Sequence, residues 1–321
     1  MGVESKVSKV IEVSKLRNWD FCPQAFCLDL KIKANNIPMT YYLARRIKLR
    51  DYFAALFREQ KRLGPELIHI EDMSPEELVE HLAFRSAESY ASAMSGRWQF
   101  LRNNDYTVQG RQVVWRSEKE KWNSHEDIYN ACYNYFDKIA THGAPITAYN
   151  DAAVSFFFRG EKYNLNIDEF RRRLIVSPND PRKNFTKKEI NFGWQTTAQV
   201  LAFCQLAHDY ESFRLKLEID EKLAKSWTDD NPVSEDVKVL HYSLADATFI
   251  ETTRKPVQVE EFMEFIRFSR ESALNAIQKK EFPPNHKNCY ICKYNVVGPD
   301  NKPVCKERNP KTRPMRPSKD D

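Results

Sequence analysis

Three cysteines in the stretch NCYICKYNVVGPDNKPVC, residues 288–305, constrain this chain more than any other feature of its sequence. Cys289 and Cys292 form a C-x-x-C pair, which turns two sulfurs toward one point, and Cys305 follows closely. Such spacing suits a soft metal site or a redox disulfide. Because most tetrahedral zinc sites and cubane iron-sulfur clusters take four protein ligands, a fourth ligand has to come from another part of the chain.

Composition indicates a globular, helix-rich protein. Of the 321 residues 41% are hydrophobic and 30% are charged, and only 8 are glycine. No apolar run approaches the roughly 20 residues of a membrane span, and residues 1–13 lack the apolar core of a secretory signal. We therefore expect a cytoplasmic or nucleoid-associated protein without a membrane partner, in which clustered cysteines bind metal. A net charge of +5 permits a nucleic-acid partner without requiring one.

The hydrophobic pattern divides the chain into segments of different periodicity. A helix interrupted by Pro23 is predicted within residues 1–40, and a helical region at 41–145. The β-rich runs of AAVSFFFRGEKYNLNIDEFRRRLIVSP, broken at Arg159-Gly160-Glu161, predict antiparallel strands. They belong to a segment of sheet and helix at 146–258. A C-terminal helix and the cysteines follow at 259–305, and the polar, proline-rich residues 306–321 are predicted to be a disordered basic tail.

This order resembles the RecB-like branch of the PD-(D/E)XK nuclease superfamily. The closer likeness is to members with an iron-sulfur cluster, such as CRISPR-associated adaptation exonucleases and AddAB-type nuclease domains. It is carried by Phe21-Cys22-Pro23 and by KKEFPPNHKNCYICKYNVVGPDNKPVC. The resemblance implies an α+β (α/β) fold, with a restriction-endonuclease-like core of mixed β-sheet flanked by helices. It also implies a helical insertion and a C-terminal cysteine segment that binds metal.

The same resemblance supplies a fourth metal ligand. Cys22, in the N-terminal helix, would join Cys289, Cys292 and Cys305 around a 4Fe-4S cluster, with zinc as the alternative metal. Cys27 competes with Cys22 for this role. The plainer alternative is that Cys22 is a buried helix cysteine and the C-terminal trio forms a surface zinc knuckle or no site at all.

The catalytic pattern of the family is only partly present. The resemblance places a vestigial catalytic carboxylate at Asp168 and a weak helix motif at Gln199, whereas Ser177 and Asn179 stand where an acid and a lysine are expected. One carboxylate cannot hold Mg²⁺ firmly, so the likeness implies an inactive or impaired nuclease. A working enzyme would need Mg²⁺ or Mn²⁺ and relocated ligands, for example Asp180 with Lys183, or the triplet Asp220-Glu221-Lys222.

Basic residues surround this vestigial centre and predict phosphate contacts. Trp194 is placed to stack on a base. The candidate nucleic-acid contacts are Arg171, Arg172, Arg173, Lys183, Lys187 and Lys188. A solvated charged face is the alternative reading of these cations.

Three functions stay open at this point. The first is a pseudo-nuclease that binds DNA, preferably single-stranded, within a larger DNA-processing, CRISPR, phage or recombination complex. The second is an active metal-dependent exonuclease or endonuclease. The third is a cluster-stabilised protein adaptor that docks through the helical region at about 50 to 140.

Overall fold

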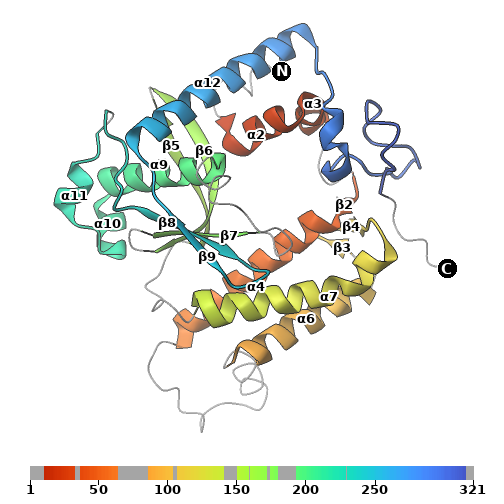
Figure 1. Cartoon of the computed structure of the whole chain (residues 1–321), viewed down its shortest axis with the longest axis horizontal. Helices are drawn as coiled ribbons and strands as arrows, with labels where there is room; N and C mark the ends of the chain where they lie inside the picture. Colours follow the sequence, from red (N-terminus) through yellow and green to blue (C-terminus); the bar gives the residue numbers. More distant parts are fainter. Residues whose placement is uncertain are drawn as a thin grey trace.

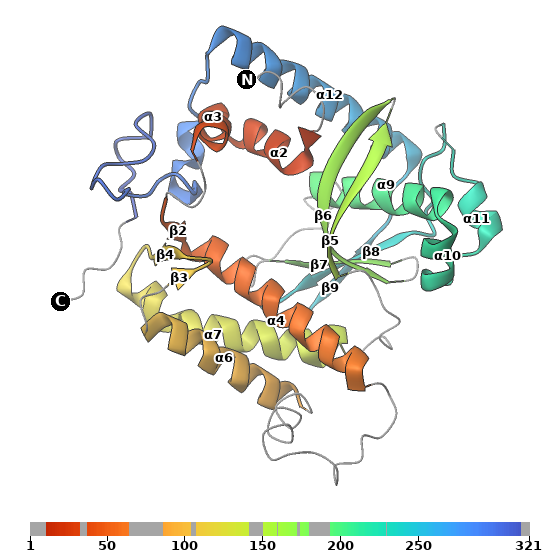
Figure 2. The same ribbon diagram turned by 180° about the vertical axis from the view of Figure 1, so that it is seen from behind.

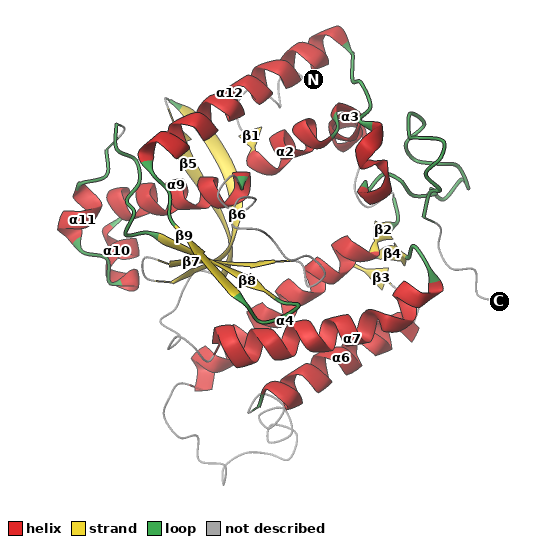
Figure 3. Ribbon diagram, in the orientation of Figure 1, coloured by secondary structure: helices red, strands yellow, loops and turns green. Residues whose placement is uncertain are grey.

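The protein has a mixed α+β architecture (Figure 3). Its structure is a computed structural model that describes residues 11–32, 37–63, 86–103, 107–140, 150–158, 160–171, 174–179, 193–228 and 230–315. Within these ranges no helix is both long enough and apolar enough to cross a membrane.

A mixed sheet forms the centre of the fold (Figure 1). Its neighbouring strands are, in order, β5 (Asn150–Phe158), β6 (Glu161–Arg171), β7 (Leu174–Asn179), β8 (Lys238–Ser243) and β9 (Phe249–Thr252). Neighbours run antiparallel except β7 and β8, which are parallel because a helical crossover joins them. A short strand, β1 (Ile11–Glu12), pairs in parallel with β6. The predicted β5–β6 hairpin is confirmed, and Gly160 turns it with a φ of +80° that favours glycine.

Helices from both ends of the chain pack near one side of this sheet. These are α2 (Val13–Phe21), α9 (Trp194–Asp209) and α12 (Pro256–Lys279), and the crossover after α9 adds α10 (Glu211–Leu217) and α11 (Glu221–Lys225). Residues 196–204 of α9 are all buried, because α9 contacts strands β5, β6 and β7 as well as α2 and α12. The first hydrophobic core lies around this helix.

A second lobe is built mainly from helices (Figure 2). It contains α4 (Tyr41–Leu63), α6 (Ala87–Asn103) and α7 (Glu118–Asn134), and a π-helical turn, Tyr135–Ala140, extends α7. A small sheet that the sequence pattern did not predict has the strand order β2 (Met39–Thr40), β4 (Arg111–Val114) and β3 (Thr107–Val108). Its core is rich in aromatic side chains, with Tyr41 stacked on Trp115 at 4.6 Å between ring centroids.

The C-terminal segment folds beside α3 (Pro23–Lys31), and both views show the two side by side (Figures 1 and 2). After α12 it forms a 3₁₀ helix, His286–Ile291, and then a compact loop. The prediction of a disordered tail is wrong for residues 306–315. Met315 is buried, donates its N–H to the Asn295 carbonyl at 2.9 Å and accepts from the Val297 N–H at 2.8 Å. The polar segment is ordered because backbone partners in the cysteine loop satisfy it; residues 316–321 lie outside the described part.

Candidate metal centre and basic cleft

A proline places the first candidate ligand in the break between two helices. Pro23 occupies the first turn of α3, and the residue before a proline is disfavoured in the α region. Cys22 accordingly has extended backbone angles, φ −168° and ψ 112°, and its N–H donates to the Asn18 carbonyl at 2.9 Å to close α2. The break therefore puts Cys22 between α2 and α3 and not within a continuous helix.

The segment before the C-x-x-C pair is hydrogen-bonded to the same break. The side-chain amides of Asn285 and Asn288 both donate to the Phe21 carbonyl, at 3.2 and 2.6 Å. Carbonyls in the last turn of a helix have no partner within the helix, so these amides satisfy one that α2 leaves open. The C-terminal cysteines are thereby held next to Cys22.

All four predicted metal ligands line one small cavity, the cysteine cavity. Its wall includes Cys22, Cys289, Cys292 and Cys305, whereas Cys27 does not contribute to it. The four thiols are buried and none is in a disulfide. Two of the sulfurs accept backbone hydrogen bonds at 3.3 Å, Cys22 Sγ from the Asn285 N–H and Cys289 Sγ from the Asn309 N–H.

The environment of these thiols is shielded from solvent and brings them near one another. Burial raises the pKa of Cys292 to about 11, and the neighbouring Cys22, Cys305 and Cys289 act in the same direction. Burial also raises the pKa of Cys305. A metal would hold the thiols as thiolates, and a set of four sulfur donors fits zinc or an iron-sulfur cluster. Within the described ranges no group of three or more His, Cys, Asp or Glu side chains is arranged around a single ion.

A large cleft, the basic cleft, lies between α2, α4 and the β5–β6 hairpin. It has a volume of about 830 Å³. The positively charged residues that line it are Arg17, Arg46, Arg50, Lys162 and Lys293. The one carboxylate among its described lining residues is Glu12, which is already paired with Lys15 at 3.2 Å. Among the described lining residues cations therefore outnumber carboxylates, although Lys293 is itself paired with Asp29.

Helix α4 supplies the lower wall of the cleft because it has two different faces. Leu43, Arg46, Ile47 and Arg50 recur at helical spacing and line the cleft. Another face, which includes Tyr41, Leu49, Phe53 and Leu56, is buried in the helical lobe.

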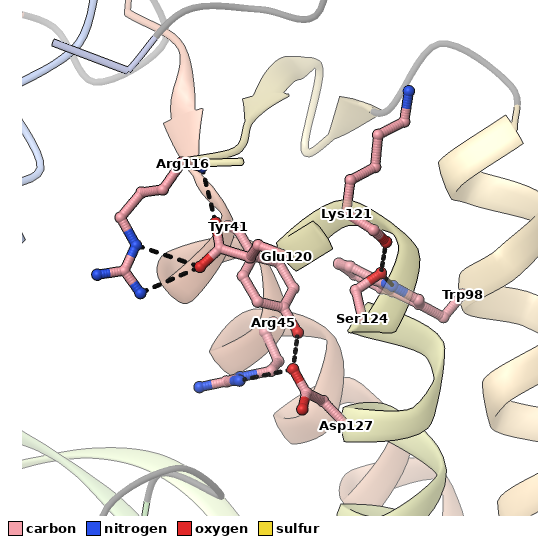
Figure 4. A network of polar contacts seen from close by, with 8 residues as sticks. All are labelled: Tyr41, Arg45, Trp98, Arg116, Glu120, Lys121, Ser124 and Asp127. Atoms are coloured by element: carbon pink, nitrogen blue, oxygen red, sulfur yellow. Dashed lines mark hydrogen bonds and ion pairs between the residues drawn. The ribbon is translucent and has the colours of Figure 1, made fainter. Parts of the chain in front are cut away.

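A polar network fixes α4 against α7 (Figure 4). The Asp127 carboxylate accepts from the Tyr41 hydroxyl at 2.7 Å and pairs with the Arg45 guanidinium at 3.3 Å. Arg45 is almost fully buried, and its guanidinium also lies 5.1 and 5.5 Å from the ring centroids of Tyr41 and Tyr42. Because α4 is held in this way, its next residue, Arg46, faces the cleft.

Two like charges come together in the basic cleft. Arg17 is on α2 and Arg46 is on α4, and both are exposed to solvent. Partial desolvation lowers the pKa of Arg17, and the positive charge of Arg46 acts in the same direction. Within the described part of the chain neither guanidinium has an ion-pair partner.

The strands that carry the predicted catalytic positions are adjacent in the sheet. Asp168 lies in β6, and Ser177 and Asn179 lie in β7. In the parallel pairing with β8, Ser177 is opposite His241 and Asn179 is opposite Ser243. The backbone therefore has these positions on neighbouring strands, and their catalytic roles stay predictions.

The two predicted site residues on α9, Gln199 and Trp194, have different surroundings. Gln199 is fully buried in α9, while Gln195, one turn earlier, lines the basic cleft. Trp194 packs edge-on against Phe265 at 4.3 Å and Phe262 at 6.2 Å, so much of its ring is engaged by α12.

Arg171, one of the predicted basic contacts, ends β6. The remaining predicted contacts lie outside the described residues: Arg172, Arg173, Lys183, Lys187 and Lys188, together with Asp180.

The literal D-x-K triplet has a structural role. Asp220 caps α11, and its Oδ1 accepts from the backbone N–H groups of Lys222 at 2.7 Å and Leu223 at 3.2 Å. Glu221 pairs with Lys225 on the exposed side of the same helix at 2.6 Å. The triplet is not among the residues that line the basic cleft.

None of the five cleft cations is among the nucleic-acid contacts predicted from the sequence. Arg17, Lys162 and Lys293 come from three distant parts of the chain. The helical spacing of Ser14, Arg17 and Asn18 was the available signal, because it marks a polar side of α2. No family model and no curated protein matches the sequence.

Proposed function

We propose that this chain binds nucleic acid, single-stranded DNA in the first instance, in the basic cleft. In this proposal it is a RecB/PD-(D/E)XK-like pseudo-nuclease that carries a thiolate-bound 4Fe-4S cluster, with zinc as the alternative. It serves within a larger DNA-processing complex. The observation that carries this proposal is the cleft of about 830 Å³, whose described lining residues include one carboxylate and five cationic side chains, one of which, Lys293, is paired with Asp29.

The sheet supports a restriction-endonuclease-like core. Three antiparallel strands, β5, β6 and β7, precede α9, and β8 then returns parallel to β7. Asp168 lies on β6, and Ser177 and Asn179 lie on β7; these are the positions to which the resemblance assigns the vestigial catalytic site. The order of a hairpin sheet, a helix, a second hairpin and a long helix agrees with the sequence pattern that carried that resemblance.

The charge and size of the cleft favour a flexible strand. Cations that neutralise phosphates give affinity that does not depend on base sequence, and about 830 Å³ is within the range of small-ligand clefts. Asn18, Asn164 and Gln195 add amide groups to the wall, and Val13, Leu43 and Ile47 add apolar surface for bases. Ser155 donates to Asn164 Oδ1 at 2.7 Å, which leaves the Asn164 amide N–H groups as donors to a ligand.

In this proposal the metal centre would join the N-terminal and C-terminal parts of the described chain. Cys22, Cys289, Cys292 and Cys305 would hold the cluster, and the backbone N–H groups of Asn285 and Asn309 would continue to donate to two of its thiolates. A bound cluster supplies strong bonds between the two ends of the described chain. The chain's own residues supply burial and hydrogen bonds, which keep solvent from the sulfurs.

The proposed function is tested by binding of fluorescently labelled single-stranded DNA to the metal-loaded protein. Anisotropy titrations between about 50 and 200 mM salt should give a log–log slope of about −0.7 per contacted phosphate. Replacing Arg50→Gln and Lys162→Gln together should make this slope shallower by about 1.4. Arg97→Gln with Lys119→Gln removes two exposed charges outside the cleft and is the matched control.

Duplex DNA and RNA of the same sequence show which strand the cleft prefers. Binding that is insensitive to salt and unchanged by the Arg50 and Lys162 substitutions would contradict a phosphate-binding cleft. An equal loss in the control variant would point to general charge attraction and would also contradict the site.

A further inference from the structure

The pair formed by Arg17 and Arg46 is not explained by the fold. The two guanidinium groups come from different helices, α2 and α4, yet they are close enough for Arg46 to lower the pKa of Arg17. Bringing like charges together in a partly desolvated place is unfavourable unless an anion offsets the repulsion. Such a pair is suited to bind a ligand with negative charge.

Two carboxylates near the cleft, Glu12 and Asp29, are already engaged by other residues. Glu12 pairs with Lys15, and Asp29 pairs with Lys293 while also accepting from the Tyr294 hydroxyl. On the opposite side of α4, Asp127 is used by Arg45. Within the described residues no carboxylate is paired with Arg17 or Arg46, so these two positive charges are open to an anionic ligand.

We propose that Arg17 and Arg46 receive the terminal phosphomonoester of a nucleic-acid strand. This inference rests on the proposed function and names the chemical form of the strand that the cleft prefers. A phosphomonoester carries a charge between about −1.5 and −2 at neutral pH, which nearly balances two guanidinium groups. An internal phosphodiester carries one negative charge and leaves one of the two positive charges unbalanced.

The shape of the cleft also favours a strand end at this place. Phe21, Ala25 and Cys292 line both the basic cleft and the cysteine cavity, so the cysteine segment forms the wall there. Arg17 is one helical turn before Phe21 on α2, and Arg46 is nearly one turn after Leu43 on α4. Arg17 therefore lies about one helical turn from that wall, and Arg46 lines the same cleft from α4, so a strand that reaches the wall would end near this pair.

Guanidinium groups suit this ligand chemically. Each presents N–H donors in a plane and stays charged at any pH that the protein experiences. Two of them can donate to several oxygens of one phosphate through charge-assisted hydrogen bonds. A lysine pair would supply charge without this planar arrangement of donors.

The test compares strands of about eight nucleotides that differ only at one end. The full-length, metal-loaded protein is titrated with strands bearing a 5′-phosphate, a 3′-phosphate or hydroxyls at both ends. We expect one phosphorylated strand to bind about tenfold more tightly than the hydroxyl strand. The double variant Arg17→Gln and Arg46→Gln should lose this preference, and Arg97→Gln with Lys119→Gln should keep it.

The outcomes separate this inference from the proposed function. If single-stranded DNA binds with the expected salt dependence but all three strands bind equally, the phosphomonoester site is wrong and the cleft proposal stands. If the double variant keeps the preference, the phosphate is held elsewhere and the inference is also wrong. If no strand binds, both proposals fail. Circular dichroism and metal content of each variant show whether a loss of binding reflects a loss of fold.

Discussion

The backbone N–H of Asn285 donates to Sγ of Cys22 at 3.3 Å, although 263 residues separate them in the sequence. Asn285 also donates its side-chain amide to the carbonyl of Phe21. Chain entropy opposes this closure by about 5 kcal/mol, because the enclosed loop is long. Two neutral hydrogen bonds contribute about 1 kcal/mol each, so a metal centre would strengthen a contact that the protein already makes.

The first prediction concerns the metal itself. Protein purified without oxygen should be brown, with broad absorbance at about 400 nm, because four thiolates would hold an iron-sulfur cluster. Replacing Cys22→Ser should remove the colour and lower the midpoint of thermal unfolding. Absorbance spectra, iron and sulfide assays and a thermal melt measure both effects.

The matched control for this prediction is Cys27→Ala. Cys27 is five residues away and also buried, but it does not line the cysteine cavity, so its variant should keep the cluster. Colourless protein with one zinc per chain would show that the site binds zinc and not an iron-sulfur cluster. Metal content that is the same in wild type and Cys22→Ser would exclude Cys22 as a ligand.

The second prediction concerns the network that positions α4. Asp127→Ala should lower the free energy of unfolding by about 3 kcal/mol, because it leaves the buried Arg45 guanidinium without this carboxylate. Glu126→Ala is the control, since Glu126 is the exposed neighbour on α7 and should change stability by less than about 0.5 kcal/mol. Urea unfolding measures both. Equal stability of the two variants would mean that Arg45 is stabilised by other contacts.

The third prediction is a dependence of stability on pH. Burial, and then the charge of Arg254, lowers the pKa of His241 from 6.5 to about 3. Between these values the unfolded chain binds a proton that the folded protein does not. His241 therefore contributes stability that is fully present above about pH 6.5 and is lost as the pH falls toward 3. The loss between about pH 7.5 and pH 5 should be about 2 kcal/mol.

Urea unfolding of wild type and of His241→Gln at both pH values isolates this contribution. The variant should lose less stability on acidification than the wild type by about that amount. His125→Gln replaces an exposed histidine and should behave as the wild type does. An unchanged pH dependence in His241→Gln would show that His241 is not neutral and buried in the folded protein.

Local sequence signals predicted those parts of the fold that local chemistry determines. Gly160 between two β-rich runs predicted the β5–β6 hairpin, and Pro23 predicted the interruption between α2 and α3. The two-residue strand β2 and the order of residues 306–315 were not predictable in this way. Both depend on backbone partners that are distant in sequence, such as Val113 for Met39 and Asn295 for Met315.

The candidate site shows the same limit. Arg45 and Arg46 are identical and adjacent in the sequence, yet the first is buried against Asp127 and the second faces the basic cleft. Their difference depends on which face of α4 packs on α7. The identity of one residue does not indicate whether it lies on the buried face or on the cleft face. The four cysteines were different, because the family resemblance added Cys22 to the C-terminal trio, and all four do line one cavity.

The last prediction is that the natural protein hydrolyses DNA very slowly or not at all with Mg²⁺ or Mn²⁺. Mg²⁺ needs several oxygen ligands, and Glu12 is the one carboxylate among the described residues that line the basic cleft. Relocation to the D-x-K triplet is disfavoured, because Asp220 uses its carboxylate to cap α11. Asp220→Ala should therefore lower the free energy of unfolding by about 1 kcal/mol, while Asp220→Asn keeps most of the cap.

Degradation of labelled DNA by wild type and both variants measures activity alongside stability. Robust metal-dependent cleavage that Asp220→Ala abolishes without unfolding the protein would show an active centre at the triplet. Cleavage that Asp168→Ala abolishes would instead place it on β6.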